Sequence, residues 1–264
     1  ALVATFDPHP IRYFKPDAAP FRLTTLDQRE RLFAAAGVDA MIVFGFDAEL
    51  AALSAEAFVE QRLLAALKVG GVVTGEDFTF GRARSGDVNA LRAWGRARGF
   101  STDAVAPVRL DGETISSSRI RAALIAGDAE TAARLLTRPY AIEGVVQHGD
   151  KLGRTIGYPT ANLDMGEYLR PAYGIYAVRG RLDDGRVLDG AANLGIRPSF
   201  DPPKELLEPH FFDFAGDLYG RTVSVELIDY LRPEAKFDTL DALVTQMDAD
   251  CARARQILSS HNPA

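Results

Sequence analysis

Strand-like and helix-like segments alternate over the first half of the chain, and this alternation limits the fold more than any other feature. Short apolar segments indicate strands, and longer segments with helical caps and glycine stops separate them. Alternation of this kind predicts a parallel sheet covered by helices, whose ligands bind at the carboxyl ends of the strands. The predicted strands are Leu2–Phe6, Val38–Phe44, Val69–Thr74 and Ser101–Val108. The predicted helices are Thr24–Ala36, Ser54–Lys68, Asp87–Arg98 and Ser117–Ile125.

The pattern changes near Arg138-Pro139, after which extended segments dominate. Asp183-Asp184-Gly185 is typical of a hairpin turn. Between Leu240 and Leu258 apolar residues recur every three or four positions, which predicts a helix. We therefore expect an α/β domain over residues 1–137 and a small antiparallel β-barrel with a C-terminal helix over 138–264. The extended segments are Tyr140–His148, Gly174–Leu182, Val187–Asn193, Leu206–Phe214 and Arg221–Tyr230.

The composition is that of a folded globular protein. Of 264 residues, 47% are hydrophobic and 25% charged, with a net charge of −6. Acidic residues exceed basic ones in both halves, which argues against nucleic-acid binding. The sequence has no apolar run of about 18 residues that could span a membrane. One cysteine, Cys251, and no recognisable signal peptide predict a cytoplasmic protein, and homo-oligomerisation is left open.

The segment from Gly149 to Asn162 carries the clearest chemical signal. Gly149, Gly153 and Gly157 recur at four-residue spacing, which lets backbone N–H groups approach phosphate oxygens. Lys151 and Arg154 add positive charge beside them. Thr160 and Asn162 offer hard oxygen ligands suited to Mg²⁺ on one face of an extended chain. On spacing alone, a glycine-rich hairpin ending at a proline explains the segment equally well.

Glu208 lies in an otherwise apolar predicted strand, next to Pro209. A carboxylate in that position is a candidate general base toward a substrate hydroxyl. An edge-strand acid that faces water is the simpler explanation of the pattern. His210 follows on the same face of the strand and either orients a partner or packs.

Three loops in the first half are candidate nucleotide or ring contacts. Ser116, Ser117 and Ser118 open a helix that carries Arg119 and Arg121, and a helix N-terminus favours anions. A capped helix with exposed arginines is the alternative. Phe78 and Phe80, in a glycine-bracketed loop, suit a planar ring, although the same loop also fits a mobile surface segment. His9, after the first strand, either contacts a nucleotide or caps its loop.

Together these segments resemble one family, the bifunctional prokaryotic riboflavin kinase/FAD synthetases. The resemblance covers essentially the whole chain. In the second half it is carried by Gly153–Asn162, Asn193–Phe200, Leu207–His210, Asp217–Gly220 and Leu231–Glu234. In the first half it is carried by Thr5–Pro10, Gly75–Gly81 and Ile115–Arg121.

The resemblance implies a Rossmann-like nucleotidyltransferase domain followed by a riboflavin kinase barrel. The kinase would use ATP and Mg²⁺ to convert riboflavin to FMN, releasing ADP. The first domain would transfer AMP from ATP to FMN, giving FAD and pyrophosphate. Glu208 would be the catalytic base, and Thr160 and Asn162 would bind Mg²⁺ and ATP phosphates within the nucleotide-binding glycine segment. His9, the three serines, Arg119 and Arg121 would bind ATP for adenylyl transfer, and Phe78 and Phe80 would contact the flavin.

The sequence departs from this family at its start. The family's first domain opens with a strand and a His-x-Gly-His loop that these 264 residues do not contain. We therefore expect an N-terminal segment to be missing, and this chain to make FMN but little FAD. A riboflavin kinase with a degenerate first module, a non-catalytic flavin- or nucleotide-binding regulator and a structural scaffold are the alternatives.

Overall fold

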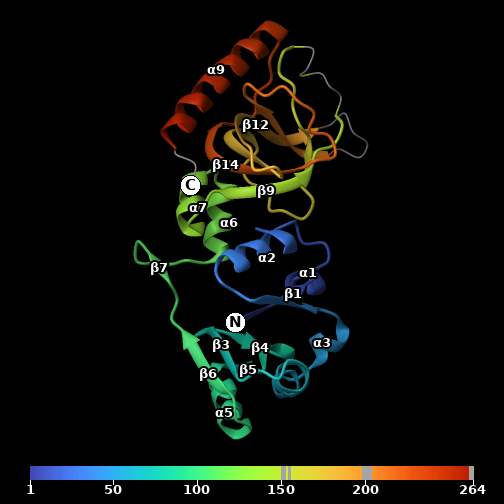
Figure 1. Cartoon of the computed structure of the whole chain (residues 1–264), viewed down its shortest axis with the longest axis vertical. Helices are drawn as coiled ribbons and strands as arrows, with labels where there is room; N and C mark the ends of the chain where they lie inside the picture. Colours follow the sequence, from blue (N-terminus) through green and yellow to red (C-terminus); the bar gives the residue numbers. More distant parts are fainter. Residues whose placement is uncertain (150–152, 154–155, 198–203, 262–264) are drawn as a thin grey trace. The chain divides into compact units, whose positions relative to one another are not determined.

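The computed structural model describes residues 1–149, 153, 156–197 and 204–261. The chain divides into two compact units (Figure 1). The N-terminal unit comprises Ala1–Ala18 and Asp27–Ile115, and the C-terminal unit comprises Ala19–Leu26 and Ser116–Ala264. None of the helices in the described ranges combines the length and apolar composition needed to cross a bilayer.

The N-terminal unit confirms the predicted parallel α/β region, with one correction. Its four long strands form two parallel pairs, β1 with β2 and β3 with β6, instead of a single sheet. Among the described residues, no strand hydrogen-bonds to both pairs. The strands are β1 (Leu2–Asp7), β2 (Ala40–Gly45), β3 (Gly71–Gly75) and β6 (Ser101–Val105). Short hairpins join β4 (Thr79–Phe80) to β5 (Gly86–Asp87) and β7 (Arg109–Leu110) to β8 (Glu113–Thr114).

Local capping shapes the helices of this unit. The loop expected after the first strand instead forms a short helix, α1, because Pro10 takes its first position and His9 Nδ1 accepts the Ile11 N–H at 3.2 Å. The predicted helix from Ser54 is α-helical only at its start and continues as a π-helix, Val59–Ala66. The helices are α1 (Pro10–Phe14), α2 (Leu26–Ala35), α3 (Ala48–Ala52), α4 (Ala55–Phe58) and α5 (Val88–Arg98).

A six-stranded antiparallel sheet forms the C-terminal unit, in the order β10-β13-β12-β11-β14-β9. Its two outer strands meet where Gln147 donates its backbone N–H to the carbonyl oxygen of Asn162 at 2.9 Å. The sheet therefore curls into the nearly closed barrel that the sequence predicted. The strands are β9 (Tyr140–Val145), β10 (Leu163–Asp164), β11 (Gly174–Leu182), β12 (Val187–Arg197), β13 (Lys204–Phe211) and β14 (Thr222–Arg232).

Two helices precede the barrel, α6 (Ser117–Ile125) and α7 (Ala129–Leu136). The sequence predicted only α6. The side chain of Asp128 caps α7 by accepting the Thr131 N–H at 2.8 Å, and this Asp-x-x-Thr spacing after Gly127 is the signal that was missed. Because α7 packs against β9 and β14, both helices cluster with the barrel. The domain boundary near residue 137 stays a prediction.

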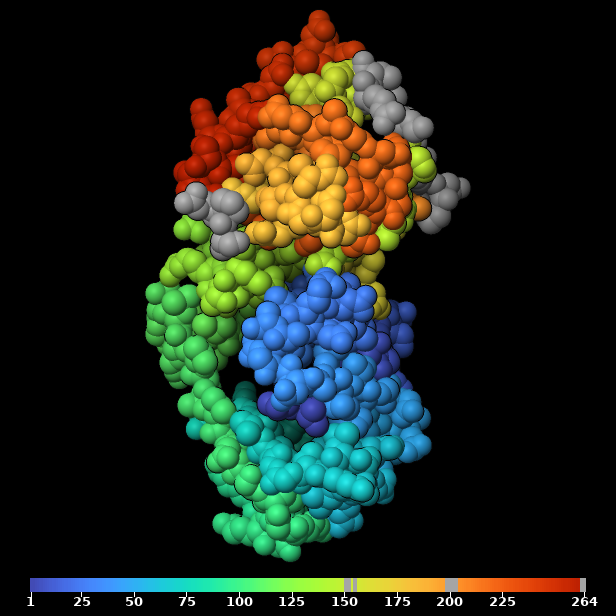
Figure 2. Space-filling model, in the orientation of Figure 1, coloured from blue at the N-terminus to red at the C-terminus, as the bar shows by residue number. Residues whose placement is uncertain are grey.

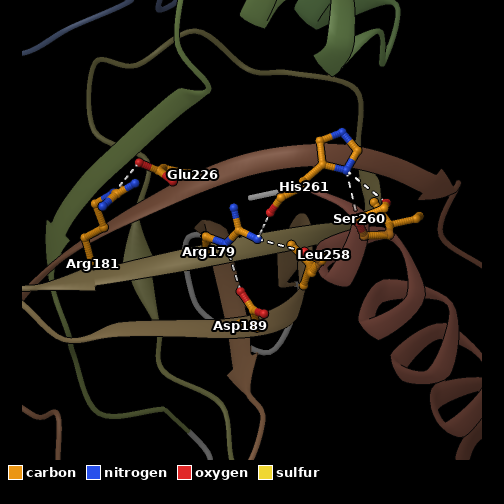
Figure 3. Close-up of polar contacts among 8 residues, drawn as sticks. Arg179, Arg181, Asp189, Glu226, Leu258, Ser260 and His261 are labelled. Carbon is orange, nitrogen blue, oxygen red and sulfur yellow. Dashed lines mark hydrogen bonds and ion pairs between the residues drawn. The ribbon is translucent and has the colours of Figure 1, made fainter. Parts of the chain in front are cut away.

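The C-terminal helix α9 (Leu240–Ser260) lies along the barrel, as its red atoms beside the orange strands show (Figure 2). Its buried Ala254 and Leu258 pack on Ala177 of β11 and neighbouring apolar residues. Arg179, also from β11, anchors the helix end by donating to the carbonyl oxygens of Leu258, at 2.9 Å, and His261 (Figure 3). This contact satisfies orphan carbonyls at the helix terminus.

Candidate active site

A cavity of about 510 Å³ opens in the C-terminal unit. Its walls come from the glycine segment, from β12 and β13, and from α9 with the loop before it. A cavity of this size falls within the range of small-molecule sites. The lining residues with chemical functions include Thr160, Asn162, Asn193, Arg197, Glu208, His210 and Glu234.

Glu208 projects into this cavity from β13. It lies directly opposite Asn193 of β12, and its side chain is 15% exposed. Its carboxylate forms an ion pair with Arg197, which also stands on β12. Glu208 is therefore not the water-facing edge acid that was the simpler explanation of the pattern.

The segment before β10 continues the pairing with β13. Leu163 lies opposite Leu207, and the Ala161 N–H donates to the carbonyl oxygen of Pro209 at 2.9 Å. This register sets Asn162 opposite Glu208. In an antiparallel sheet the backbone N and C=O of one residue point toward the same adjacent strand. The C=O of Pro209 faces Ala161, so its nitrogen, which has no hydrogen to donate, faces that side too. The ladder between β13 and β12 consequently loses no hydrogen bond.

The two predicted metal ligands lie in the same cavity. Asn162 is 7% exposed, Thr160 is half-buried, and neither side chain has a hydrogen-bond partner within the part of the chain that the structure describes. Two uncommitted hard oxygens near a carboxylate fit the ligand preference of Mg²⁺.

The three glycines have different structural roles: Gly149 lies against the Asn162 side chain, Gly153 against backbone, and Gly157 in open space with a left-handed conformation. A Cβ at Gly149 would stand 2.5 Å from the Asn162 amide nitrogen, and one at Gly153 would overlap the Tyr158 carbonyl oxygen. Gly157 adopts a φ of 89°, which favours glycine. Both the hairpin and the phosphate interpretation are compatible with this geometry. Lys151 and Arg154 lie outside the described residues.

Two contacts hold the Tyr158–Thr160 segment in place. His210 Nδ1 lies 2.9 Å from the Pro159 carbonyl oxygen, and since a carbonyl only accepts, Nδ1 carries the proton. The Tyr158 hydroxyl donates to Asp248 of α9, and this hydrogen bond raises the pKa of Tyr158 to about 12. His210 therefore orients the backbone beside Thr160, one of its two predicted roles.

The opposite wall is apolar, and the sequence predicted only a helix face for its α9 residues. Phe237, Leu243 and Met247 line the cavity beside Cys251. Burial, reinforced by the negative charge of Asp250, raises the pKa of the Cys251 thiol to about 11. Asp250 accepts a bidentate hydrogen bond from Arg232 at 2.6–3.0 Å. Leu243, Met247 and Cys251 recur at helical spacing in the sequence, and that spacing is the same for a helix that faces the core and for one that lines a cavity.

The residues predicted for adenylyl transfer fall in both compact units. In the N-terminal unit, His9 caps α1, and Phe78 stacks on the buried Phe80 with ring centroids 5.4 Å apart. In the C-terminal unit, Ser116, Ser117 and Ser118 open α6 as exposed residues.

Ser116 caps this helix by accepting the Arg119 N–H at 3.2 Å, as the alternative interpretation expected, but Arg119 and Arg121 are half-buried instead of exposed. Arg121 is half-buried and donates through Nε to the carbonyl oxygen of Phe21 at 2.9 Å. Burial lowers the pKa of Arg121. The nucleotide roles of these residues stay predictions.

Comparison with known proteins finds relatives that match over nearly the whole of this chain. The Flavokinase family, described as riboflavin kinase, matches residues 136–258, and the FAD synthetase family matches residues 1–119. A bifunctional riboflavin kinase/FMN adenylyltransferase from Haemophilus influenzae is 40% identical over 258 residues, covering 98% of this chain and 84% of that protein. The Escherichia coli K12 protein of the same description is 39% identical over 263 residues, covering 100% of this chain and 84% of that protein.

A solved structure also matches over most of the chain. It is a Streptococcus pneumoniae crystal structure described as a macrolide-efflux protein. It aligns with a TM-score of 0.84 and 33% identity over 96% of this chain and 83% of that one.

Proposed function

This chain belongs to the family of bifunctional riboflavin kinase/FMN adenylyltransferases, and we propose that the cavity of its C-terminal unit is where riboflavin accepts the γ-phosphate of ATP. The observation that supports this most directly is the meeting of Thr160, Asn162 and Glu208 in one cavity. A shared cavity is what a phosphate-binding segment and a base acting on one substrate require, and this supports the proposal.

Glu208 acts as the base. The ribityl 5′-oxygen bonds to the γ-phosphorus, the bond from that phosphorus to the bridging β-oxygen breaks, and ADP leaves. The hydroxyl proton passes to the Glu208 carboxylate, which its low exposure shields from bulk water. Because the transition state of phosphoryl transfer is loose, positioning and charge stabilisation contribute more than proton removal.

Thr160 and Asn162 would hold the Mg²⁺–ATP complex through their side-chain oxygens, beside Gly149 and Gly153 of the same cavity. When bound, Mg²⁺ supplies the positive charge that stabilises the β- and γ-phosphate oxygens. His210 keeps the backbone at Pro159 in position through its Nδ1–H. The apolar wall of Phe237, Leu243 and Met247 covers the flavin ring.

The N-terminal unit carries the second activity, adenylyl transfer from ATP to FMN. Its similarity to FAD synthetases supports this over the degenerate-module alternative. Within that unit, His9 contacts the ATP phosphates and Phe78 stacks against the flavin. Phe78 is 36% exposed on a base of buried Phe80, which leaves it open to a planar ligand.

The test is flavin chromatography after incubation with riboflavin, ATP and Mg²⁺. Glu208→Gln should lower FMN formation by about a hundredfold or more, while nucleotide binding by calorimetry is retained. Glu226→Gln is the matched control, because Glu226 is a barrel carboxylate paired with Arg181 and does not line the cavity. Near-normal FMN formation by Glu208→Gln would refute the assignment of the base.

A further inference from the structure

Three alternate residues of β12 form a cradle beside the candidate base. Asn193, Gly195 and Arg197 share one face of the strand, because side chains two apart point the same way. The carboxylate of Glu234, from the segment after β14, occupies the gap over Gly195. A Cβ at Gly195 would overlap this carboxylate, so a larger residue there would displace the Glu234 carboxylate from the gap.

The Glu234 carboxylate has a partner on each side of that gap. Its Oε1 accepts a hydrogen bond from Asn193 Nδ2 at 3.2 Å and lies 3.8 Å from Arg197 Nη1. The other terminal nitrogen of Arg197, Nη2, pairs with Glu208. One guanidinium thus bridges two carboxylates, one 15% exposed and one 40% exposed.

A guanidinium suits this arrangement because it presents five donors in a rigid plane. The Glu208 side chain has several rotatable bonds, and a base must be held near its productive geometry to act. An arginine fixed at both ends restricts the carboxylate more than one that is fixed only at Glu208. Glu234 and Asn193 provide the second fixed end.

We propose that Arg197 is a positioning residue that aims Glu208 at the substrate hydroxyl, and that Glu234 acts through Arg197 by holding its guanidinium. This inference rests on the proposed function of Glu208. Neither Arg197 nor Glu234 exchanges a proton in the reaction. Their effect therefore falls on kcat, with little change in the KM for Mg²⁺–ATP.

The experiment is a double-mutant cycle measured by FMN formation. Glu234→Ala should lower kcat about three- to fivefold, as expected for a partly exposed ion pair, and Glu234→Asp should recover part of the loss. Arg197→Met should lower kcat by about tenfold or more. Arg197→Lys should recover only part of that loss, because lysine keeps the positive charge but lacks the rigid plane of donors. Because Glu234 acts through Arg197, adding Glu234→Ala to Arg197→Met should have no further effect.

Controls separate the outcomes. Asp213→Ala removes an exposed ion pair with Arg255 outside the cavity and should leave kcat unchanged. Thermal melting of each variant excludes a folding defect. Additive effects of Arg197→Met and Glu234→Ala, or a change confined to KM, would overturn the inference. If Glu208→Gln, assayed alongside, also keeps near-normal kcat, then the proposed function fails as well.

Discussion

The backbone N–H of Ala161 donates to the carbonyl oxygen of Pro209 over 2.9 Å. This hydrogen bond joins two segments that are distant in the sequence and sets the register between them. Asn162 and Glu208, the next residues in opposite directions along the two chains, consequently face each other across the pair. The relative position of the candidate metal ligand and the candidate base therefore depends on the pairing of these two segments, which Leu163 and Leu207 continue.

Replacing Asn162 should change the Mg²⁺ requirement. Asn162→Ala removes a buried oxygen donor, so the Mg²⁺ concentration for half-maximal FMN formation should rise by about tenfold. A Mg²⁺ titration at saturating ATP measures this. Asn89→Ala, an exposed change on α5, is the control. An unchanged Mg²⁺ dependence in Asn162→Ala would contradict the metal role.

Cys251 should report occupancy of the cavity. Its thiol pKa of about 11, against an ordinary value of 9.0, leaves roughly a hundredfold less thiolate at pH 8. Alkylation by iodoacetamide should therefore be slow at pH 8 and should accelerate as the pH rises toward 11. Riboflavin with Mg²⁺–ATP should slow it further, because Cys251 lines the cavity. Mass spectrometry follows the reaction, and a rate unaffected by ligands would count against this location of the site.

For two fully buried tyrosines, removal of the hydroxyl should change the free energy of unfolding in different ways. Tyr140 and Tyr176 are each 1% exposed. The Tyr140 hydroxyl is buried with no hydrogen-bond partner among the described residues, and burial raises the pKa of Tyr140. The Tyr176 hydroxyl donates to the Ala172 carbonyl oxygen at 2.6 Å.

Tyr140→Phe should therefore leave the free energy of unfolding unchanged or increase it by up to about 1 kcal/mol. Tyr176→Phe should decrease it by about 1–2 kcal/mol, because the Ala172 carbonyl loses its donor. Urea denaturation of both variants provides the comparison. A larger loss for Tyr140→Phe than for Tyr176→Phe would show that the Tyr140 hydroxyl is satisfied.

Arg179 should matter more to stability than an exposed arginine of the same barrel. Its side chain is 6% exposed and contacts Asp189 and the end of α9 (Figure 3). Arg179→Met should cost about 2–3 kcal/mol, since the α9 carbonyl oxygens of Leu258 and His261 lose their donor. Arg186→Met, at a 52% exposed site in the β11–β12 hairpin, should cost less than about 1 kcal/mol. Equal losses of stability in the two variants would contradict the anchoring role.

Local sequence patterns predicted much of the fold. The apolar segments of the first half became parallel strands, and the three- and four-residue spacing after Leu240 became α9. Helix α7 was missed because its cap depends on one side chain, Asp128. The single sheet predicted for the first half was wrong, because periodicity identifies strands without specifying which of them pair.

For the candidate site, too, the sequence identified part of the residues and the tertiary structure supplied the rest. The sequence by itself singled out Thr160, Asn162 and Glu208, because hydroxyl, carboxamide and carboxylate groups in apolar or glycine-rich surroundings are chemically distinctive. Only the tertiary structure placed them in one cavity, added Arg197 and Glu234, and turned the apolar face of α9 toward that cavity. The physical reason is that side-chain chemistry is local, whereas register, barrel closure and helix docking arise from contacts between distant segments.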